Sequence, residues 1–409
     1  MKRVAIIGAG ISGLSIGQLL KETHDVTIFE KENTAGGLVR CLKYENSIFH
    51  ICGGHVFNTK RDDVLDWFWS IMSPEEFSSF NRNSIIALDN KTWIPYPIEN
   101  HIYNLPQETQ KEIINDLLHA KVSENFDNFD TFLHNTFGKT LYSLYFRPYN
   151  QKIWQQDLSQ IPIDWLEGKL PISTHPDIIF NNFNHIKEKT FVHSFFWYNQ
   201  IGGSQRIVEI LSKDLNIITN CNIEGVSYNN KKWNINGTNY DIVVFCGNIK
   251  QLSALVDGVD ISNYTKQLSE LRYHGTTSVF CEIDANPYTW IYLPSEDYSC
   301  HRIICTGNFI SRKTNKNRIT ATIEFTNRVS LSEIKNNLSK VPLHPTYITH
   351  SYNEYTYPVQ TKESRSVIAG VKERLESQRF YLLGRFAEWE YYNMDAAMGA
   401  AIDLSKHIL

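Results

Sequence analysis

Three glycines near the N-terminus form the first pattern in this sequence that could do chemistry. Gly8, Gly10 and Gly13 follow the apolar run 3–8 and open a helical stretch that extends to residue 21. In a dinucleotide-binding turn the first glycine permits the tight turn, the second lets a pyrophosphate approach the backbone, and the third lets the helix pack on the strand. Ser12 lies inside this pattern, at the positive end of the helix dipole. The pattern predicts a site for the diphosphate of a dinucleotide.

A carboxylate and a second glycine pair follow at the spacing that such a site needs. Glu30 ends the apolar run 25–30, 20 residues after Gly10, where an acid accepts hydrogen bonds from ribose hydroxyls. A glycine pair at 36–37, shortly after this acid, is typical of FAD-dependent enzymes of the amine-oxidase and glutathione-reductase type. We therefore predict FAD as the cofactor. Three residues around the second turn are expected beside it: Lys31, Gly37 and Leu38.

The elements that must position these residues change in type along the chain. The order of strand, helix and strand over 3–30 predicts a parallel sheet with crossover helices. Residues 61–72 and 107–145 have helical patterns, and strand patterns return over 217–245. An antiparallel sheet is predicted from the apolar or alternating segments 275–283, 288–293, 302–306 and 318–325, and a final helix from 394–408.

Composition and charge argue against several classes of protein. The 409 residues carry a net charge of −4, which gives no general attraction to nucleic acid or to an anionic membrane. No apolar run reaches the length of about 18 residues that a membrane span needs. The seven cysteines form no CxxC pair, and the 14 histidines show no metal-ligand spacing. We expect a reduced cytoplasmic protein without a metal site.

Several further segments resemble one family in their order and spacing. The family is the UDP-galactopyranose mutases, and the similar segments are 53–59 (GGHVFNT), 148–154 (PYNQKIW), 200–203 (QIGG), 245–247 (FCG), 301–303 (HRI) and 355–359 (YTYPV). The most specific match is 384–394 (GRFAEWEYYNM), and the resemblance runs nearly from end to end. Each short match alone is weak, but their common order is hard to obtain by chance.

The resemblance implies a fold and a domain division that composition does not reveal. The fold class is α/β, with a Rossmann-like FAD-binding domain, a helical insertion and an antiparallel substrate-domain sheet. The FAD-binding domain would comprise residues 1–75, 200–260 and 375–409. A mainly helical domain over 76–199 would carry part of the substrate pocket, and the substrate sheet would span 261–374.

The resemblance also implies an isomerase that interconverts the pyranose and furanose forms of a nucleotide-diphosphate sugar. The substrate would be UDP-galactopyranose or a relative such as TDP-fucopyranose, in a cytoplasmic pathway of polysaccharide and O-antigen biosynthesis. Reduced flavin is the covalent catalyst of this family, and its N5 atom is the nucleophile, so no catalytic side chain is assigned. NAD(P)H as reductant and a homodimer are further expectations.

Five residues in the matching segments are expected at the substrate. Arg302 carries a planar fork of donors suited to a diphosphate, and the hydroxyls of Tyr357 and Tyr391 can bond the same oxygens without adding charge. Tyr149 and Trp154 are about 140° apart on an ideal helix, so they would line different parts of one pocket. Each of these residues also has a purely structural interpretation. Arg302 could form an ion pair, and Trp154 and the tyrosines could lie in the core.

The remaining cofactor residues also follow from the resemblance. His55 would contact the flavin from a loop, although a histidine there can also simply cap a turn. Arg385 would face the flavin or its diphosphate. The other expected cofactor contacts are Val226, Gly384, Asn393 and Met394.

Three departures from the family pattern bear on specificity. Ser173 stands where the family has an arginine that helps to bind the diphosphate, so Arg147 or Arg206 is a candidate replacement. Asn393 replaces the usual aspartate of the family. Asn58 replaces the second histidine of the segment 53–59, which resembles the family's flavin-side segment and is given that name below.

Two other functions share the FAD motifs. One is an oxidoreductase of the amine-oxidase or protoporphyrinogen-oxidase type, and the other is a flavin-binding protein without activity. Arg302 and the YYNM segment argue against the first, since an apolar substrate needs no diphosphate site. The departures at Ser173 and Asn393 keep the second open.

Overall fold

A five-stranded parallel sheet forms the centre of one half of the molecule. We describe a computed structural model over residues 1–45, 47–119, 126–163, 174–186, 194–310 and 317–409. The strand order is β20 (Phe380–Leu382), β13 (Ile242–Phe245), β1 (Arg3–Ile7), β2 (Asp25–Phe29) and β9 (Asn216–Ile218). The central strands are short apolar runs because both faces of a parallel sheet are covered.

One layer of elements covers each face of this sheet. Successive side chains of β1 point alternately into the two layers. Val4 and Ile6 pack with α1 (Ile11–Leu20), α2 (Asp62–Ile71), α7 (Ser204–Leu211) and α12 (Met394–Ile408). Ala5 faces the other layer, which contains the elements β10 (Val226–Asn229), β11 (Lys232–Ile235), β12 (Thr238–Tyr240), β14 (Val256–Asp257), α8 (Leu252–Leu255), α9 (Thr265–Glu270) and α11 (Lys362–Glu376). This alternation is the two-residue period of a strand.

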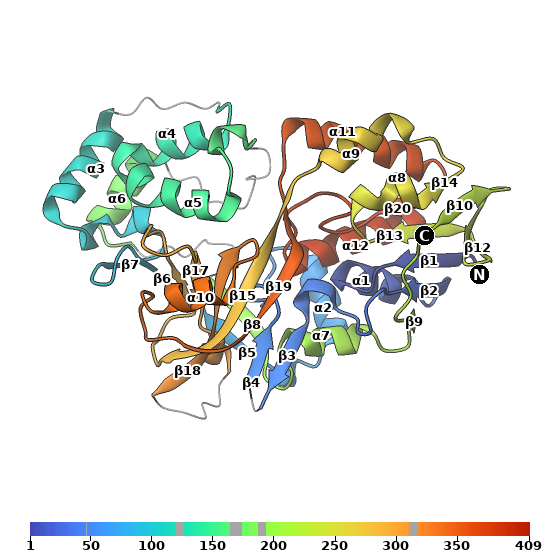
Figure 1. Ribbon diagram of the computed structural model, residues 1–409, viewed down its shortest axis with the longest axis horizontal. Coiled ribbons are helices and arrows are strands. Elements are labelled where there is room, and N and C mark those ends of the chain that lie inside the picture. Colours follow the sequence, from blue (N-terminus) through green and yellow to red (C-terminus); the bar gives the residue numbers. More distant parts are fainter. Residues whose placement is uncertain (46, 120–125, 164–173, 187–193, 311–316) are drawn as a thin grey trace.

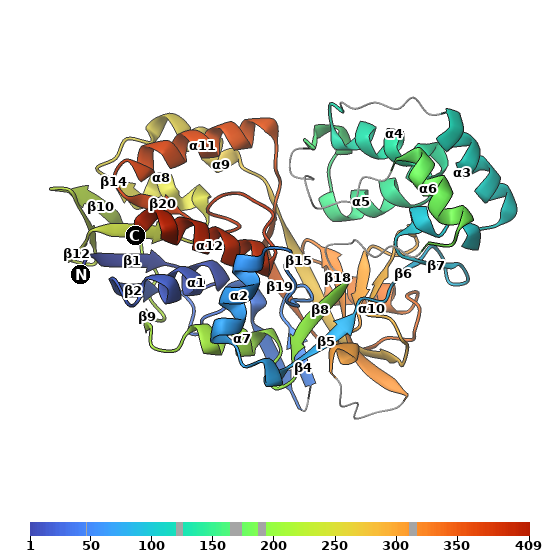
Figure 2. The ribbon, with the colours of Figure 1, turned by 180° about the vertical axis from the view of Figure 1, so that it is seen from behind.

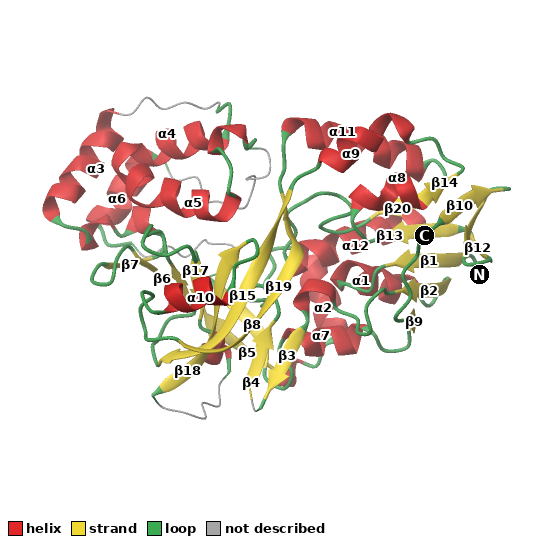
Figure 3. Cartoon of the chain, viewed as in Figure 1, coloured by secondary structure: helices red, strands yellow, loops and turns green. Residues whose placement is uncertain are grey.

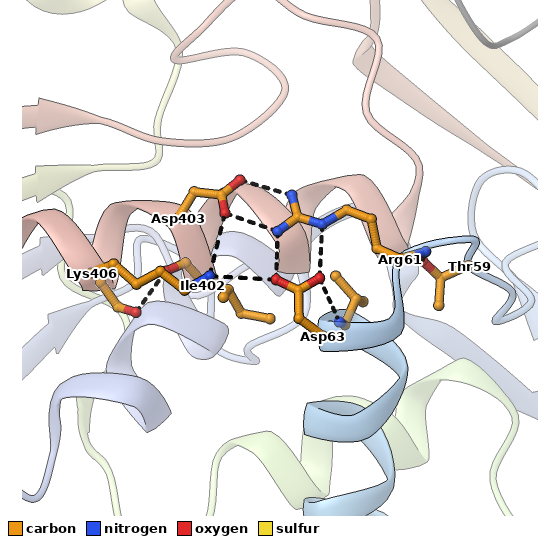
Figure 4. A network of polar contacts seen from close by, with 8 residues as sticks. Thr59, Arg61, Asp63, Ile402, Asp403 and Lys406 are labelled. Carbon is orange, nitrogen blue, oxygen red and sulfur yellow. Dashed lines mark hydrogen bonds and ion pairs between the residues drawn. The ribbon is translucent and has the colours of Figure 1, made fainter.

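A charged network joins the start of α2 to the last helix (Figure 4). Arg61 donates to both oxygens of Asp403, at 2.7 and 2.8 Å, and to both oxygens of Asp63, at 3.0 and 2.7 Å. Lys406 lies 3.5 Å from Asp63. The pKa of Asp63 is lowered to about 2, mainly by the hydrogen bonds from Arg61. These contacts are exposed and connect segments more than 300 residues apart in the chain.

A seven-stranded sheet forms the second half. Its order is β19 (Thr346–Pro358), β15 (Tyr273–Asp284), β18 (Arg318–Thr326), β17 (Arg302–Ile304), β16 (Trp290–Tyr292), β6 (Ser84–Ala87) and β7 (Trp93–Pro95), and α10 (Leu331–Leu338) packs on it. All pairs are antiparallel except β16 with β6. Two ribbons, β3 (Cys41–Tyr44) with β4 (Ser47–His50) and β5 (Phe77–Asn81) with β8 (Phe195–Asn199), complete the strands.

Helices from the middle of the chain form a separate lobe over this sheet (Figures 1 and 2). They are α3 (Gln107–His119), α4 (Phe129–Leu141), a π-helical turn over Tyr142–Phe146, α5 (Arg147–Trp154) and α6 (His175–Phe183). Figure 3 shows this lobe as almost wholly helical, at the end of the molecule opposite the parallel sheet. Its core is aromatic and includes Phe132, Phe137, Tyr145 and Trp154.

The predicted α/β fold with a Rossmann-like unit is confirmed. Two details differ from the sequence analysis. Four strands lie within 76–199, which was predicted to be mainly helical: β6 and β7 extend the seven-stranded sheet beyond β16, with β7 at its edge, and β5 and β8 form a ribbon. The 13-residue strand β19 was not predicted as a strand, since most of its side chains are half-buried and show no clear alternation. Otherwise the domain boundaries remain predictions. Among the described residues, no helix is long and apolar enough to cross a membrane.

Candidate functional site

The glycine turn after β1 has the geometry of a diphosphate site. Gly8 has a φ of +109°, which favours glycine, and a Cβ on Gly13 would lie 1.9 Å from the carbonyl oxygen of Gly8. A Cβ on Gly10 would meet no atom within 4 Å. The third glycine is therefore required by the fold itself, whereas the second borders open space at the start of α1. Such an opening fits a pyrophosphate near the backbone N–H groups of the helix.

Three other predicted cofactor residues gather around this turn. A Cβ on Gly384, whose φ is +103°, would lie 2.6 Å from Oγ of Ser12. A Cβ on Gly37 would lie 3.4 Å from Cα of Gly10. Segments from the start and the end of the chain thus meet at the N-terminus of α1.

The carboxylate of Glu30 is buried at the end of β2 and held by backbone donors. Its Oε2 accepts from the N–H of Ala9 at 2.7 Å, and its Oε1 accepts from the N–H of Glu32 at 2.9 Å. These bonds place the acid directly beside the glycine turn. Lys31 is exposed next to it, and Leu38 is half-buried in the short helical turn Gly37–Val39.

The histidine of the flavin-side segment has a buried nitrogen without a partner. Within the described residues, Nε2 of His55 makes no hydrogen bond. Burial, followed by the nearby His50 and Arg385, lowers the pKa of His55 to about 3, so its imidazole is neutral near pH 7. An unpaired buried nitrogen is costly unless another group meets it. Together with the open Gly10, this nitrogen fits a bound flavin.

A second buried histidine positions that segment. Nδ1 of His50 accepts from the backbone N–H of His55 at 3.3 Å, and its Nε2 lies 2.9 Å from the hydroxyl of Tyr198. Because Nδ1 accepts, the proton of a neutral ring lies on Nε2. Burial lowers the pKa of His50 to about 4. The sequence analysis did not identify this residue.

All five predicted substrate residues line one cavity of about 220 Å³. Tyr149 and Trp154 reach it from α5, Arg302 from the start of β17, Tyr357 from the end of β19, and Tyr391 from the loop before α12. The two aromatic residues of α5 line the same cavity although they are far apart around the helix. Its other walls are mainly aromatic and apolar, with Phe129, Leu133, Phe137, Tyr145 and Phe146 among them.

Arg302 both lines the cavity and forms a buried ion pair. Its Nε donates to Oε2 of Glu324, which is wholly buried, and its Nη2 donates to the hydroxyl of Tyr357 at 3.0 Å. Burial opposes ionisation of Glu324, but the Arg302 charge and His301 hold the pKa of that carboxyl well below its usual range. The two interpretations of Arg302 are therefore not exclusive.

Glu324 also joins the cavity to the flavin-side segment. Its Oε1 accepts from the N–H of Gly53 at 2.7 Å. Glu324 was missed by the sequence analysis, although an acid between Ile323 and Phe325 in a strand pattern is a usable signal of a buried partner. Tyr96 and Glu99 are further cavity residues that no motif indicated, and Asn150, within the matching segment 148–154, lines the cavity without having been assigned a role.

Arg385 contacts the two predicted substrate tyrosines of the cavity. Its guanidinium donates to the carbonyl oxygens of Tyr392, at 3.0 Å from Nε, and of Thr356, at 2.9 Å from Nη1. It also lies 5.7 Å from the ring centre of Tyr357 and 5.3 Å from that of Tyr391, and these two rings are stacked 5.6 Å apart. Arg385 thus stabilises the pair of tyrosines.

Some predicted residues lie elsewhere. Val226 is buried in the four-stranded sheet beside Phe29, and Met394 is buried in the first turn of α12. Asn393 is the exposed residue at the N-terminus of α12, which packs against α1. Asn58 donates to the carbonyl of Phe195 between the flavin-side segment and β8, so it has a structural partner.

Neither candidate replacement for the missing arginine lines the cavity. Arg206 donates to both oxygens of Glu76 at 2.9 Å, because α7 packs beside the ribbon of β5 and β8. Arg147 is exposed at the start of α5. A replacement by either residue stays a prediction, and Ser173 lies outside the described residues.

Comparisons with known proteins place this geometry among related enzymes. A family model described as an NAD(P)-binding Rossmann-like domain matches residues 6–70. The chain is 29% identical over 194 residues to "Probable UDP-galactopyranose mutase" of Klebsiella pneumoniae, covering 45% of this chain and 48% of that protein. It is 21% identical over 430 residues to UDP-galactopyranose mutase of Mycoplasma genitalium, covering 99% of this chain and 94% of that protein. The chain is related to the UDP-galactopyranose mutases.

A third relative and two solved structures extend the comparison. The chain is 26% identical over 212 residues to dTDP-fucopyranose mutase of Escherichia coli, covering 48% of this chain and 53% of that protein. A crystal structure of reduced UDP-galactopyranose mutase superposes with a TM-score of 0.87 at 21% identity, covering 100% of this chain and 94% of the other. A protein described as a putative protoporphyrinogen oxidase from Exiguobacterium reaches a TM-score of 0.77 at 15% identity, covering 100% and 98%.

These matches bear out the resemblance to the mutases. The alignments span about half of the Klebsiella and Escherichia relatives and nearly all of the Mycoplasma one. At these identities the superposed structures establish the fold alone, and both mutase and oxidase folds are among them.

Proposed function

We propose that this protein is an FAD-dependent nucleotide-sugar mutase that interconverts pyranose and furanose forms. The observation that carries the proposal is the convergence of Tyr149, Trp154, Arg302, Tyr357 and Tyr391 from separate segments on one cavity. UDP-galactopyranose and dTDP-fucopyranose are the candidate substrates, since relatives carry these names.

The cavity has the groups that a nucleotide-diphosphate sugar needs. Arg302 would donate hydrogen bonds to the diphosphate from the guanidinium N–H groups that Glu324 and Tyr357 do not use. The hydroxyl of Tyr357 accepts from Arg302, so its own proton is free to be donated to a phosphate oxygen. Burial raises the pKa of Tyr357 well above its usual value, which keeps that proton in place. The rings on α5 would stack on the base or the sugar.

The proposal places the cofactor at the glycine turn and the flavin-side segment. The turn at Gly8, Gly10 and Gly13 would hold the FAD diphosphate, and Glu30 the ribose. The unpaired nitrogen of His55 would meet the flavin. Reduced flavin, when bound, would supply the nucleophile for the anomeric carbon, with no net redox change. The side chains would orient the sugar and stabilise the charge of the departing diphosphate.

The wider assignments complete the proposal. The enzyme would act in the cytoplasm, in the synthesis of surface polysaccharide, with NAD(P)H as the reductant and as a homodimer. These statements follow from the kinship with the mutases and are open to direct measurement.

The decisive experiment is turnover by the purified protein after reduction with dithionite. It would be incubated without oxygen with UDP-galactopyranose and, separately, with dTDP-fucopyranose, and the pyranose and furanose products resolved by chromatography. A furanose product that forms only with reduced flavin supports the mutase. Flavin reduction by an amine or a porphyrinogen, with no furanose product, would contradict it and favour an oxidase. Binding of a nucleotide-sugar without any isomerisation would favour the inactive flavoprotein.

A further inference from the structure

Lys152 lies on α5 between the two aromatic residues that line the cavity. Its ammonium reaches from the helical lobe to the connection between β16 and β17. There Nζ donates to three backbone carbonyl oxygens: those of Leu293 at 2.8 Å, Cys300 at 3.2 Å, and Ser295. An ammonium has three N–H donors, so this set of acceptors uses all of them.

The backbone of the same residue is held from the seven-stranded sheet. The carbonyl oxygen of Lys152 accepts from Oγ1 of Thr326 at 2.7 Å, and Thr326 ends β18 and lines the cavity. One turn earlier, the ring of Tyr149 meets the ring of Tyr292 edge-on, with centres 5.4 Å apart. The end of α5 is therefore attached to β16, to β18 and to the connection before β17.

These contacts connect two walls of the cavity, one formed by α5 and the other by the start of β17. Cys300, whose carbonyl accepts from Lys152, lies two residues before Arg302. Tyr292, which contacts Tyr149, is the direct partner of Arg302 in the β16–β17 ladder. Lys152 thus links the helix that carries the stacking rings to the strand that carries the cation.

We infer that Lys152 is a positioning residue, which sets the distance between the aromatic wall of α5 and Arg302 and so the affinity for the nucleotide-sugar. This inference rests on the proposed function and names a determinant of binding within the same site. Lys152 does not line the cavity, so it would act through Tyr149, Trp154 and Arg302. Ring stacking and charge-assisted hydrogen bonds both depend on the distance to the ligand, so a shift of one wall weakens the contacts made by the other.

The charge state of Lys152 provides a specific readout. Burial lowers the pKa of Lys152 to about 8, whereas the nearby Cys300, Glu296 and Asp297 act to raise it. The groups that face the ammonium are the ring of Tyr298, at 4.8 Å, the carboxylates of Glu296 and Asp297, the thiol of Cys300, and His301. A neutral amine has two N–H donors for three acceptors. The attachment should weaken as pH rises through about 8.

Lys250 offers a matched control in the half that contains the parallel sheet. Its Nζ also donates to two backbone carbonyls, those of Ser269, at 2.7 Å, and Leu271, and it lies 5.4 Å from the ring centre of Tyr273. Burial lowers its pKa as well. It does not line the cavity. Lys250→Gln removes the same type of contact without touching α5.

The experiment compares Lys152→Gln with Lys250→Gln in the flavin-loaded protein. UDP and dTDP are titrated separately by calorimetry, and kcat and KM are measured with the sugar substrate that the wild type converts. For Lys152→Gln we expect the Kd of the bound diphosphate and the KM to rise about tenfold or more, with kcat changed less than about threefold. Lys250→Gln should match the wild type in both, and flavin content should be equal in all three.

The pH profile separates positioning from general loss of structure. In the wild type and in Lys250→Gln, kcat/KM should fall as pH rises above about 8, and Lys152→Gln should lack that fall. Lys152→Arg keeps its charge, so its profile should stay flat across the same range. If Lys152→Gln loses flavin or unfolds, the pH profile of Lys152→Arg tests the inference instead. A flat profile supports it, and a fall above about pH 8 like that of the wild type overturns it.

The outcomes distinguish the two proposals. If the wild type forms no furanose and binds neither diphosphate, the proposed function is wrong, and this inference is withdrawn with it. If the wild type is active but Lys152→Gln has the same Kd, KM and pH profile as Lys250→Gln, the function stands and the inference is overturned.

Discussion

The cofactor region and the substrate cavity are built in different ways. Around α1, the decisive atoms belong to the backbone, and the need for glycine follows from contacts such as the 1.9 Å approach of a Cβ on Gly13 to Gly8. The cavity instead depends on side chains from α5, β17, β19 and the loop before α12, and its cation is held by a buried acid. A backbone site can be recognised from a short motif, whereas a side-chain site depends on partners far away in the sequence.

The largest effect should come from the cation of the cavity. Arg302→Met would leave Glu324 buried without its main partner, which should lower the free energy of unfolding by about 3–5 kcal/mol and weaken UDP binding about 100-fold. Chemical denaturation and calorimetry measure the two quantities. The double variant Arg302→Met with Glu324→Gln should recover most of the stability but none of the affinity. Recovery of both would mean that Arg302 has no role in binding.

The two glycines of the turn should separate folding from cofactor binding. Gly13→Ala forces an overlap with the backbone of Gly8 and should cost about 3 kcal/mol of stability, with loss of flavin. Gly10→Ala meets no protein atom and should leave the stability of the flavin-free protein within about 0.5 kcal/mol while weakening FAD binding. Denaturation of the flavin-free proteins and flavin titration test this. Equal flavin affinity for Gly10→Ala and the wild type would contradict a diphosphate at this turn.

Between the two regions, the buried histidines should make the fold sensitive to acid. The pKa of His50 is lowered from 6.5 to about 4 by burial, so between these pH values the unfolded chain binds a proton that the folded protein does not. Stability should therefore fall as pH drops from about 6.5 to about 4, by up to roughly 3 kcal/mol from this residue. His50→Asn should flatten this part of the curve of unfolding free energy against pH.

The smallest effect concerns one hydroxyl in the cavity. Tyr357→Phe keeps the ring that stacks on Tyr391 but removes the acceptor of the Arg302 hydrogen bond and a donor to the substrate. We expect UDP affinity to fall by about 1 kcal/mol, roughly fivefold, with little change in flavin binding. Calorimetry on the flavin-loaded variant measures this. A matching loss of flavin would show that the two regions are not independent.

Much of the fold and part of the site could be predicted. The turn at residues 8–13, the acid at Glu30 and the final helix were identified because each depends on local chain geometry. The predicted substrate residues were chosen through their resemblance to known segments, and all five line one cavity. The ion pair of Arg206 could not be predicted, because its partner Glu76 lies 130 residues earlier in the sequence and no local pattern indicates that contact.

The sequence by itself determined the dinucleotide turn, the alternation of element types and the identity of the aromatic and cationic side chains. Only the tertiary structure decided their partners. Arg302 and Glu324 are direct neighbours in the β17–β18 ladder, and Lys152 reaches the β16–β17 connection only because α5 packs above the sheet. The physical reason is range: backbone geometry is set within a few residues, whereas an ion pair or a hydrogen bond depends on which strands and helices become neighbours.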